Sequence, residues 1–321
     1  MPHPSVTILL PVLNEEGFID ACLGSLADQD YPGDLEVIVA DGGSTDATLD
    51  RIDAWKEKLA GLRVVQNPRR RQSYGLNLAA EEARGEILVR ADAHTTYAID
   101  YVRRSVDALR ETGASAVGGS QHAAGRSPFG RAVAAAMGTP LATGPARFRH
   151  TSKRTEADTV YLGAFRKSDW RRLGGWRTFP TGVAEDADLY YRWRKSGAVV
   201  VIDPEIRSTY SPRDTIGGLW RQYYRYGMGK ADMLYVNGEL PSWRPTAPLL
   251  LIVGLTAAVV GLIWTWWPLV GLTALWLGSL AVATRGRPLV MVAGALMHLA
   301  YGAGMVRGLL RRPGAVRRGV R

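Results

Sequence analysis

Short β-rich runs alternate with amphipathic stretches from Val6 to about Ile202, and this alternation limits the possible folds more than any other feature. Alternation at this spacing predicts βαβ units and a mainly parallel sheet, which is an α/β fold. Ligands bind beyond the carboxyl ends of the strands in such sheets. The expected strands are Val6–Val12, Leu35–Ala40, Arg63–Gln66 and Glu86–Arg90, and the expected helices are Ile19–Leu26, Thr45–Leu59, Ser73–Ala83 and Ile99–Thr112.

Polar groups follow three of these strands directly. Pro11, Asn14 and Glu15 end the first run, and the loop Asp41–Asp46, with sequence DGGSTD, ends the second. Two glycines allow a sharp turn, and Thr45 or Asp46 can cap the next helix. A plain turn and cap explains this loop as well as a role of Asp41 as an acceptor for a base or ribose. The loop holds no Lys or Arg, which disfavours phosphate binding.

Asp92-Ala93-His94 follows the fourth strand. Side chains at i and i+2 point to the same side of an extended backbone. The carboxylate and the imidazole could therefore share one divalent cation, with nucleotide phosphates completing its shell. An ordinary strand end is the alternative for an isolated motif of this kind.

Glu185 and Asp186 open an expected helix that continues through Trp193. Acids in a first helical turn can simply stabilise the helix dipole. Two neighbouring carboxylates can also raise one another's pKa and supply a general base. The preceding loop 180–183 is expected to leave both accessible.

Gln222, Arg225 and Tyr226 lie in the aromatic and basic segment Trp220–Lys230. An amphipathic helix resting on lipid headgroups explains this composition. Arg225 could alternatively clamp a diphosphate leaving group with two hydrogen bonds.

The net charge of +10 is unevenly distributed. Residues 1–245 contain all 30 acidic residues and 32 of the 40 basic ones, whereas residues 246–321 contain eight Arg and no acid. A nearly neutral N-terminal part argues against nucleic-acid binding. The single Cys22 excludes an intrachain disulfide. No basic segment precedes Val6–Val12, so we expect a buried strand there, no signal peptide, and a cytosolic N-terminal domain.

The C-terminal part contains long uncharged runs. Thr246–Thr284 spans 39 residues, which suits two helices joined at Trp266-Trp267-Pro268, with Trp264 in the same aromatic belt. Leu289–Val306 adds 18 residues that either span the membrane or form a re-entrant helix. His298 within it is a functional candidate or a packing histidine.

Several motifs together resemble glycosyltransferase family 2, the inverting GT-A fold enzymes, over roughly residues 5–235. Within that family they are similar to the ExoA-like group of membrane-associated sugar transferases. The matching segments are VTILLPVLNEE, VIVADGGSTDAT, NPRRRQSYGLN, GEILVRADAHTTYAIDYV, GAFRKSDWRRLGGW, EDADLYYRWRKSG, RQYYRYGMGKA and HLAYGAG.

The resemblance implies a nucleotide-sugar donor, most often a UDP-sugar, and a role for each matching position. Asp92 and His94 stand at the family's D-x-D position, which binds diphosphate and Mg²⁺ or Mn²⁺. Asp186, next to Glu185, matches the proposed general base. The matching nucleotide-binding positions are Pro11, Asn14, Glu15, Asp41 and Asp92, and those touching acceptor and diphosphate are Gln222, Arg225 and Tyr226.

His94 and Tyr226 depart from the commoner family residues, which are Asp and Trp, and the second change argues against processivity. We expect an inverting hexosyltransferase of the cytoplasmic membrane that elongates a polyprenyl-diphosphate-linked saccharide for exopolysaccharide or cell-surface glycan. The alternatives are a polyprenyl-phosphate sugar synthase, a processive polysaccharide synthase and a silent membrane scaffold. The expected regions are a GT-A domain over 1–212, an interface region over 213–245, membrane segments within 246–307 (about 247–265, 268–284 and 289–306) and an Arg-rich tail over 308–321.

Overall fold

The computed structural model describes residues 3–143, 151–240 and 242–320, so Arg321 of the basic tail lies outside it. The chain divides into two compact units, each of which is described by itself. The domain limits expected from the sequence stay predictions. Unit 1 comprises Met1–His122, Arg147–Thr178 and Glu185–Tyr210, and unit 2 comprises Ala123–Ala146, Phe179–Ala184 and Ser211–Arg321.

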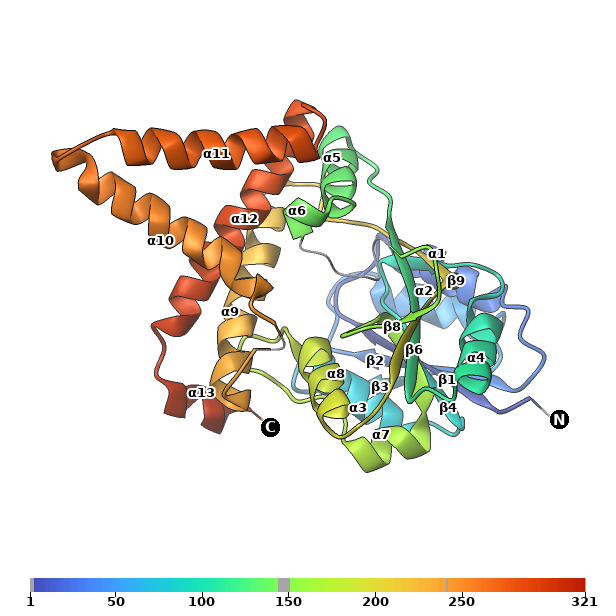
Figure 1. Ribbon diagram of the computed structural model, residues 1–321. Helices are drawn as coiled ribbons and strands as arrows, with labels where there is room; N and C mark the ends of the chain where they lie inside the picture. The colour runs from blue at the N-terminus through green and yellow to red at the C-terminus, as the bar shows by residue number, and fades with distance from the viewer. Residues whose placement is uncertain (1–2, 144–150, 241, 321) are drawn as a thin grey trace. The chain divides into compact units, whose positions relative to one another are not determined.

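The described strands form one nine-stranded sheet in the order β3-β2-β1-β4-β8-β6-β9-β5, with β7 paired to β9 (Figure 1). The first four strands run parallel, and β8 pairs antiparallel with both β4 and β6. The expected mainly parallel α/β fold is thereby confirmed. The strands are β1 (Val6–Val12), β2 (Leu35–Asp41), β3 (Leu62–Gln66), β4 (Ile87–Arg90), β5 (Thr95–Tyr97), β6 (Ala116–Ala123), β7 (Thr155–Glu156), β8 (Tyr161–Arg166) and β9 (Val200–Tyr210).

Helices of unit 1 cover both faces of the sheet, because successive side chains of a strand point to opposite faces. In β1, Ile8 and Leu10 pack into a core shared with α1, α2 and α4, whereas Leu9 packs into a second core with α3, α7 and α8. The helices are α1 (Ile19–Ala27), α2 (Thr48–Trp55), α3 (Gln72–Glu82), α4 (Tyr101–Thr112), α7 (Lys167–Leu173) and α8 (Glu185–Lys195).

The helix α2 is shorter than the stretch Thr45–Leu59 that the sequence predicts. Its start is delayed because the Asp46 carboxylate accepts hydrogen bonds from both the backbone N–H and the hydroxyl of Thr48. Residues before Thr48 are thus left free to form a loop beside the carboxyl end of β2.

Among the described residues, the regular elements that lie wholly within unit 2 are helices. Thr215 caps the long helix α9, because its hydroxyl oxygen accepts a hydrogen bond from Gly218 N. The expected break near Trp266 is confirmed, since α10 and α11 are separate helices (Figure 1). The helices are α5 (Pro128–Met137), α6 (Pro140–Thr143), α9 (Ile216–Asn237), η2 (Arg244–Thr246), α10 (Ala247–Val260), η3 (Gly261–Ile263), α11 (Trp267–Ala283), α12 (Pro288–Leu309) and α13 (Pro313–Gly319).

Glycines bring α9 and α12 into direct backbone contact. A Cβ atom on Gly304 would lie 2.0 Å from the carbonyl oxygen of Tyr224, and one on Gly227 would lie 2.0 Å from that of Tyr301. Any larger side chain at either position would force the helices apart. The same glycines therefore set the separation and the register of the pair.

Among the described residues, Arg244–Ile263 and Pro288–Leu309 are helices long and apolar enough to cross a membrane, by length and composition. They differ in burial, with 6% of the apolar window buried in the first and 44% in the second. Trp266 and Trp267 stack at 3.8 Å between ring centroids, exposed at the turn between α10 and α11. Membrane insertion of these helices stays a proposal.

Candidate active site

The loops that follow β1 and β2 are tied to each other by hydrogen bonds. Asn14 N donates to Ser44 Oγ at 2.9 Å, Thr45 N donates to Asn14 Oδ1 at 2.8 Å, and Glu15 N donates to Thr48 Oγ1 at 2.8 Å. Asn14 adopts a φ of 56°, a conformation that Asn tolerates better than most residues. The residues predicted to bind the nucleotide thus belong to one connected edge.

Asp41 is the buried residue at the end of β2. Its carboxylate accepts hydrogen bonds from Gly43 N at 3.0 Å and Ser44 N at 3.1 Å. Gly43 has a φ of 79°, which suits glycine and permits this tight turn. Asp41 therefore shapes the loop in this state, while its contact with a ribose or base stays a prediction. Pro11 lies in the same edge, half-buried and paired in register with Ala40.

The chain turns after β4, which corrects the extended backbone expected for Asp92 and His94. The turn forms because Thr95 N donates to the carbonyl oxygen of Asp92 at 3.1 Å. Tyr97 fixes the backbone of Asp92 on both sides, since its hydroxyl accepts a hydrogen bond from Asp92 N and donates one to Asp92 O. The Asp92 side chain is nearly buried at the end of the strand.

Two residues at this edge suit a divalent cation. Asp92 accepts its side-chain contacts from Gln72 and Arg90 at Oδ1, and His94 Nδ1 lies 3.8 Å from Glu15 Oε1. Carboxylate and imidazole are both common ligands of such ions. No cluster of three or more metal-binding side chains occurs in the part of the chain that the structure describes. One carboxylate and one imidazole fit a divalent cation in kind, and the sharing of that cation with a phosphate-bearing ligand stays a prediction.

Arg90, which the sequence patterns did not single out, connects two of the predicted site residues. Its Nη2 lies 3.2 Å from Asp92 Oδ1, and its Nη1 pairs with Asp186 Oδ2. Burial opposes the guanidinium charge, but the carboxylates of Asp186, Asp92 and Glu185 raise the pKa of Arg90 well above its usual value. The apolar run before it made Arg90 look like an ordinary strand end.

The first turn of α8 presents two carboxylates with different surroundings. Asp186 accepts a hydrogen bond from Trp176 Nε1 at 2.9 Å, and its side chain is 36% exposed. Glu185 is buried, so the expected accessibility is wrong for Glu185 and right for Asp186. Burial and the neighbouring Asp186 raise the pKa of Glu185 to about 7. Nothing in the sequence spacing of Trp176 indicates this contact.

The remaining predicted residues lie together on α9 of unit 2. Gln222 Nε2 donates to Tyr226 Oη at 3.1 Å, and Arg225 Nη2 donates to the carbonyl oxygen of Thr181 at 3.1 Å. Arg225 and Tyr226 are exposed. His298 bonds to Trp276 Nε1 and to the carbonyl oxygen of Leu141, so it connects helices of unit 2.

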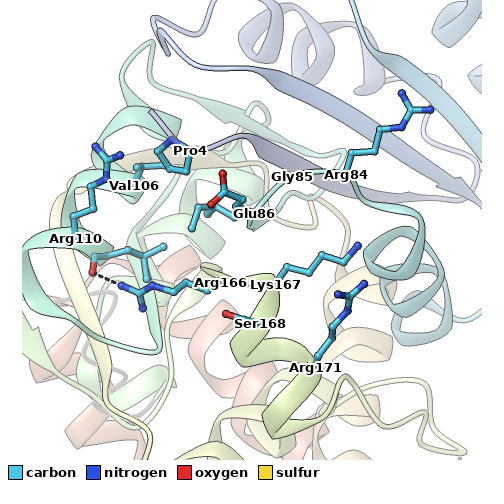
Figure 2. A pocket seen from close by; sticks show the side chains of 12 residues that line it. Pro4, Arg84, Gly85, Glu86, Val106, Arg110, Arg166, Lys167, Ser168 and Arg171 are labelled. Carbon is cyan, nitrogen blue, oxygen red and sulfur yellow. Dashed lines mark hydrogen bonds between the residues drawn. The ribbon is translucent and has the colours of Figure 1, made fainter. Parts of the chain in front are cut away.

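A cavity of about 660 Å³ lies at the opposite, amino end of the parallel strands. It opens beside Pro4 before β1 and Glu86 before β4, and Figure 2 shows its basic side chains. Arg166 is held by the carbonyl oxygens of Ala114 and Leu109. Burial and the nearby Arg171 charge lower the pKa of Lys167. The cavity is therefore separate from the residues predicted for catalysis. Its basic residues are Arg84, Arg110, Arg166, Lys167 and Arg171.

Two family models match this chain. The model described as Glycosyl transferase family 2 matches residues 7–170, and the one described as Glycosyl transferase family group 2 matches residues 147–304. The first match contains the ends of β1, β2 and β4, and the second contains the start of α8 and all of α9.

Individual relatives extend the similarity over most of the chain. The succinoglycan biosynthesis protein ExoA of Rhizobium meliloti (strain 1021) is 31% identical over 321 aligned positions, which cover 95% of each chain. A dolichyl N-acetyl-α-D-glucosaminyl phosphate 3-β-D-2,3-diacetamido-2,3-dideoxy-β-D-glucuronosyltransferase of Methanococcus voltae is 26% identical over 71% of this chain and 74% of its own.

One solved structure is similar over nearly the whole chain. It is the mannosyltransferase PcManGT from Pyrobaculum calidifontis in complex with GDP-Man and Mn²⁺, which superimposes with a TM-score of 0.69 at 25% identity. The superposition covers 96% of this chain and 88% of that one.

Proposed function

The chain belongs to glycosyl transferase family 2, and from this we propose that it is a membrane-associated inverting hexosyltransferase that extends a lipid-linked saccharide. The donor is a nucleoside-diphosphate sugar. The proposal rests on one observation, which is that Asp92 and Asp186 both contact the guanidinium of Arg90. This contact places the residue assigned to the metal and the diphosphate, Asp92, beside the candidate base, Asp186.

We assign the proton transfer to Asp186. Its carboxylate takes the proton of the acceptor hydroxyl, whose oxygen attacks the anomeric carbon on the face opposite the diphosphate. One C–O bond forms while the bond to the diphosphate breaks, so the configuration inverts. A general base contributes about 10²–10⁴-fold to such a step.

Asp92 and His94 are the residues that we assign to a divalent cation. When bound, Mg²⁺ or Mn²⁺ would stabilise the negative charge of the leaving diphosphate. Arg225 on α9 can add a second positive charge near a diphosphate. Asn14, Glu15, Pro11 and Asp41 would contact the nucleoside from the connected loops.

A lipid-linked acceptor is supported by the dolichyl-phosphate-linked sugar in the name of the Methanococcus voltae relative and by the exposed apolar helices α10 and α11. We propose that these helices enter the cytoplasmic membrane while the catalytic unit remains in the cytosol. The arginines after α12 would then contact anionic lipid.

A donor screen tests the proposal. Purified protein is incubated with membrane lipid extract and a panel of UDP- and GDP-sugars, and the release of UDP or GDP is measured. Thin-layer chromatography of radiolabelled lipid, with and without mild acid, distinguishes an extended saccharide from a polyprenyl-phosphate sugar. No lipid-dependent release with any sugar of the panel would contradict the proposed function.

A further inference from the structure

Strand alternation places one cation against the start of α8. Ile87 and Val89 of β4 pack into one core and Leu88 into the other, so Arg90 points to the same face as Leu88. That face is covered by α8, which begins with Glu185 and Asp186. The Arg90 side chain is 6% exposed, too little for water to neutralise its charge.

The guanidinium of Arg90 contacts two carboxylates to which the proposed function gives different tasks. One fork nitrogen contacts Asp92 Oδ1 at 3.2 Å and another pairs with Asp186 Oδ2. Trp176 occupies the second oxygen of Asp186. A planar guanidinium presents donors in a fixed geometry, so it can fix the distance between two acceptors in a way that an ammonium cannot.

Charge balance at this position changes when a divalent cation binds. The negative charges of three carboxylates, those of Asp92, Glu185 and Asp186, act on Arg90, and Asp92 and Asp186 contact it directly. A second cation at Asp92 would face the guanidinium across one carboxylate, where like charges repel strongly in a poorly solvated site. The two cations therefore compete for Asp92, whereas Asp186 remains available to Arg90.

We propose that Arg90 is a positioning residue that holds Asp186 beside Asp92 and serves as the counter-charge of Asp92 until a divalent cation takes that place. The inference rests on the proposed function, which assigns the cation to Asp92 and the base to Asp186. Binding of the cation leaves the guanidinium to Asp186 alone. Cation binding at Asp92 thus determines whether Arg90 is shared by the two carboxylates or contacts Asp186 alone.

Metal affinity tests this exchange without any turnover. Mn²⁺ binding to the full-length protein in detergent micelles is followed by electron paramagnetic resonance with no donor present. Arg90→Gln removes the competing charge, so we expect Mn²⁺ to bind about tenfold more tightly. Arg90→Lys keeps the charge and should stay within about twofold of the wild type. A residue that only stabilised the fold would give weaker Mn²⁺ binding when replaced.

Arg166→Gln is the matched control. Arg166 lies in the same sheet, at its amino end, and also donates to fixed acceptors. Its replacement should leave the Mn²⁺ affinity unchanged.

Kinetics supply the second readout. We expect Arg90→Gln to lower kcat about 100-fold while the donor KM changes less than about threefold, because the base loses its orientation and the donor keeps its contacts. The kcat of Arg90→Lys should be about tenfold higher than that of Arg90→Gln.

Equal or weaker Mn²⁺ binding in Arg90→Gln, no measurable binding in either protein, or an unchanged kcat would overturn the proposal. If Arg90→Gln does not fold, Arg90→Gln combined with Asp186→Asn removes both charges and must bind Mn²⁺ more tightly than Asp186→Asn alone. Absence of sugar transfer by the wild type would contradict the proposed function but not the Mn²⁺ comparison, so the two failures are distinguishable.

Discussion

The carboxyl end of the parallel strands is acidic, whereas their amino end is basic. Asp41 and Asp92 lie at the first end together with Asp186 of α8, and Arg166 and Lys167 lie at the second around a cavity. At the cavity, Arg166 donates to the carbonyl oxygens of Ala114 and Leu109 and Lys167 donates to that of Ala83. At the acidic end, Asp92 and Asp186 share the guanidinium of Arg90, and Asp41 accepts hydrogen bonds from its own loop. The carboxyl end, which we propose for catalysis, is therefore distinguished by carboxylates that share a partner and not by the volume of a cavity.

The largest expected effect is at the base. Asp186→Asn keeps the shape and the Trp176 contact but removes proton acceptance, so kcat should fall by about 10³-fold while nucleotide still binds. Release of nucleoside diphosphate measures kcat, and equilibrium binding of labelled UDP or GDP measures nucleotide affinity. Undiminished turnover would move the base to another residue of the acidic end.

Metal removal should have the next largest effect. EDTA is expected to lower wild-type activity by about 100-fold, and excess Mn²⁺ should restore it. Asp92→Asn should show a similar loss that Mn²⁺ does not restore, with His94→Ala as a second ligand variant. Full activity in the presence of chelator would contradict the assignment of a divalent cation to this end of the sheet.

Glu185 should make stability depend on pH. Its folded pKa of about 7 lies above the ordinary 4.5, so the folded state holds a proton that the unfolded state releases. This stabilisation is present below pH 4.5 and is lost as pH rises towards 7, up to ~3 kcal/mol. Chemical unfolding in detergent at several pH values measures the slope, and Glu185→Gln should flatten it. An identical slope in that variant would assign the dependence to other groups.

The smallest effect is expected at the basic end. Arg171→Gln removes one exposed cation beside the cavity, far along the strands from Asp92, so transfer rates should stay within about twofold. The same assay as for Asp186→Asn applies. A loss above tenfold would show that both ends of the sheet take part, and would break the contrast.

Much of the sheet was predictable because local patterns determine it. Val6–Val12 matches β1 in full, since a continuous apolar run bounded by polar residues has few alternatives. The antiparallel strands β8 and β6 beside β4 were not expected, because their pairing joins segments far apart in the chain. The start of α2 was predicted too early because the hydrogen bonds from Thr48 to the Asp46 carboxylate form a local turn that competes with the helix.

The site was predictable where its residues lie in loops and not where they lie in the core. Asp92, His94 and Asp186 follow strands or open a helix, so their position alone indicates exposure to a ligand. Arg90 and Trp176 are buried among apolar neighbours, and only tertiary contacts reveal their partners. The family placement is confirmed, whereas the role of each residue stays a prediction.

The glycine contacts between α9 and α12 give unit 2 a mechanical property. Because Gly227 and Gly304 bring backbone against backbone, no layer of adjustable side chains lies between the two helices at these points. A displacement of α12 along its axis would therefore press on the backbone of α9 and shift it as well. Arg225 and Tyr226, on the same helix as Gly227, would then shift in step with α12.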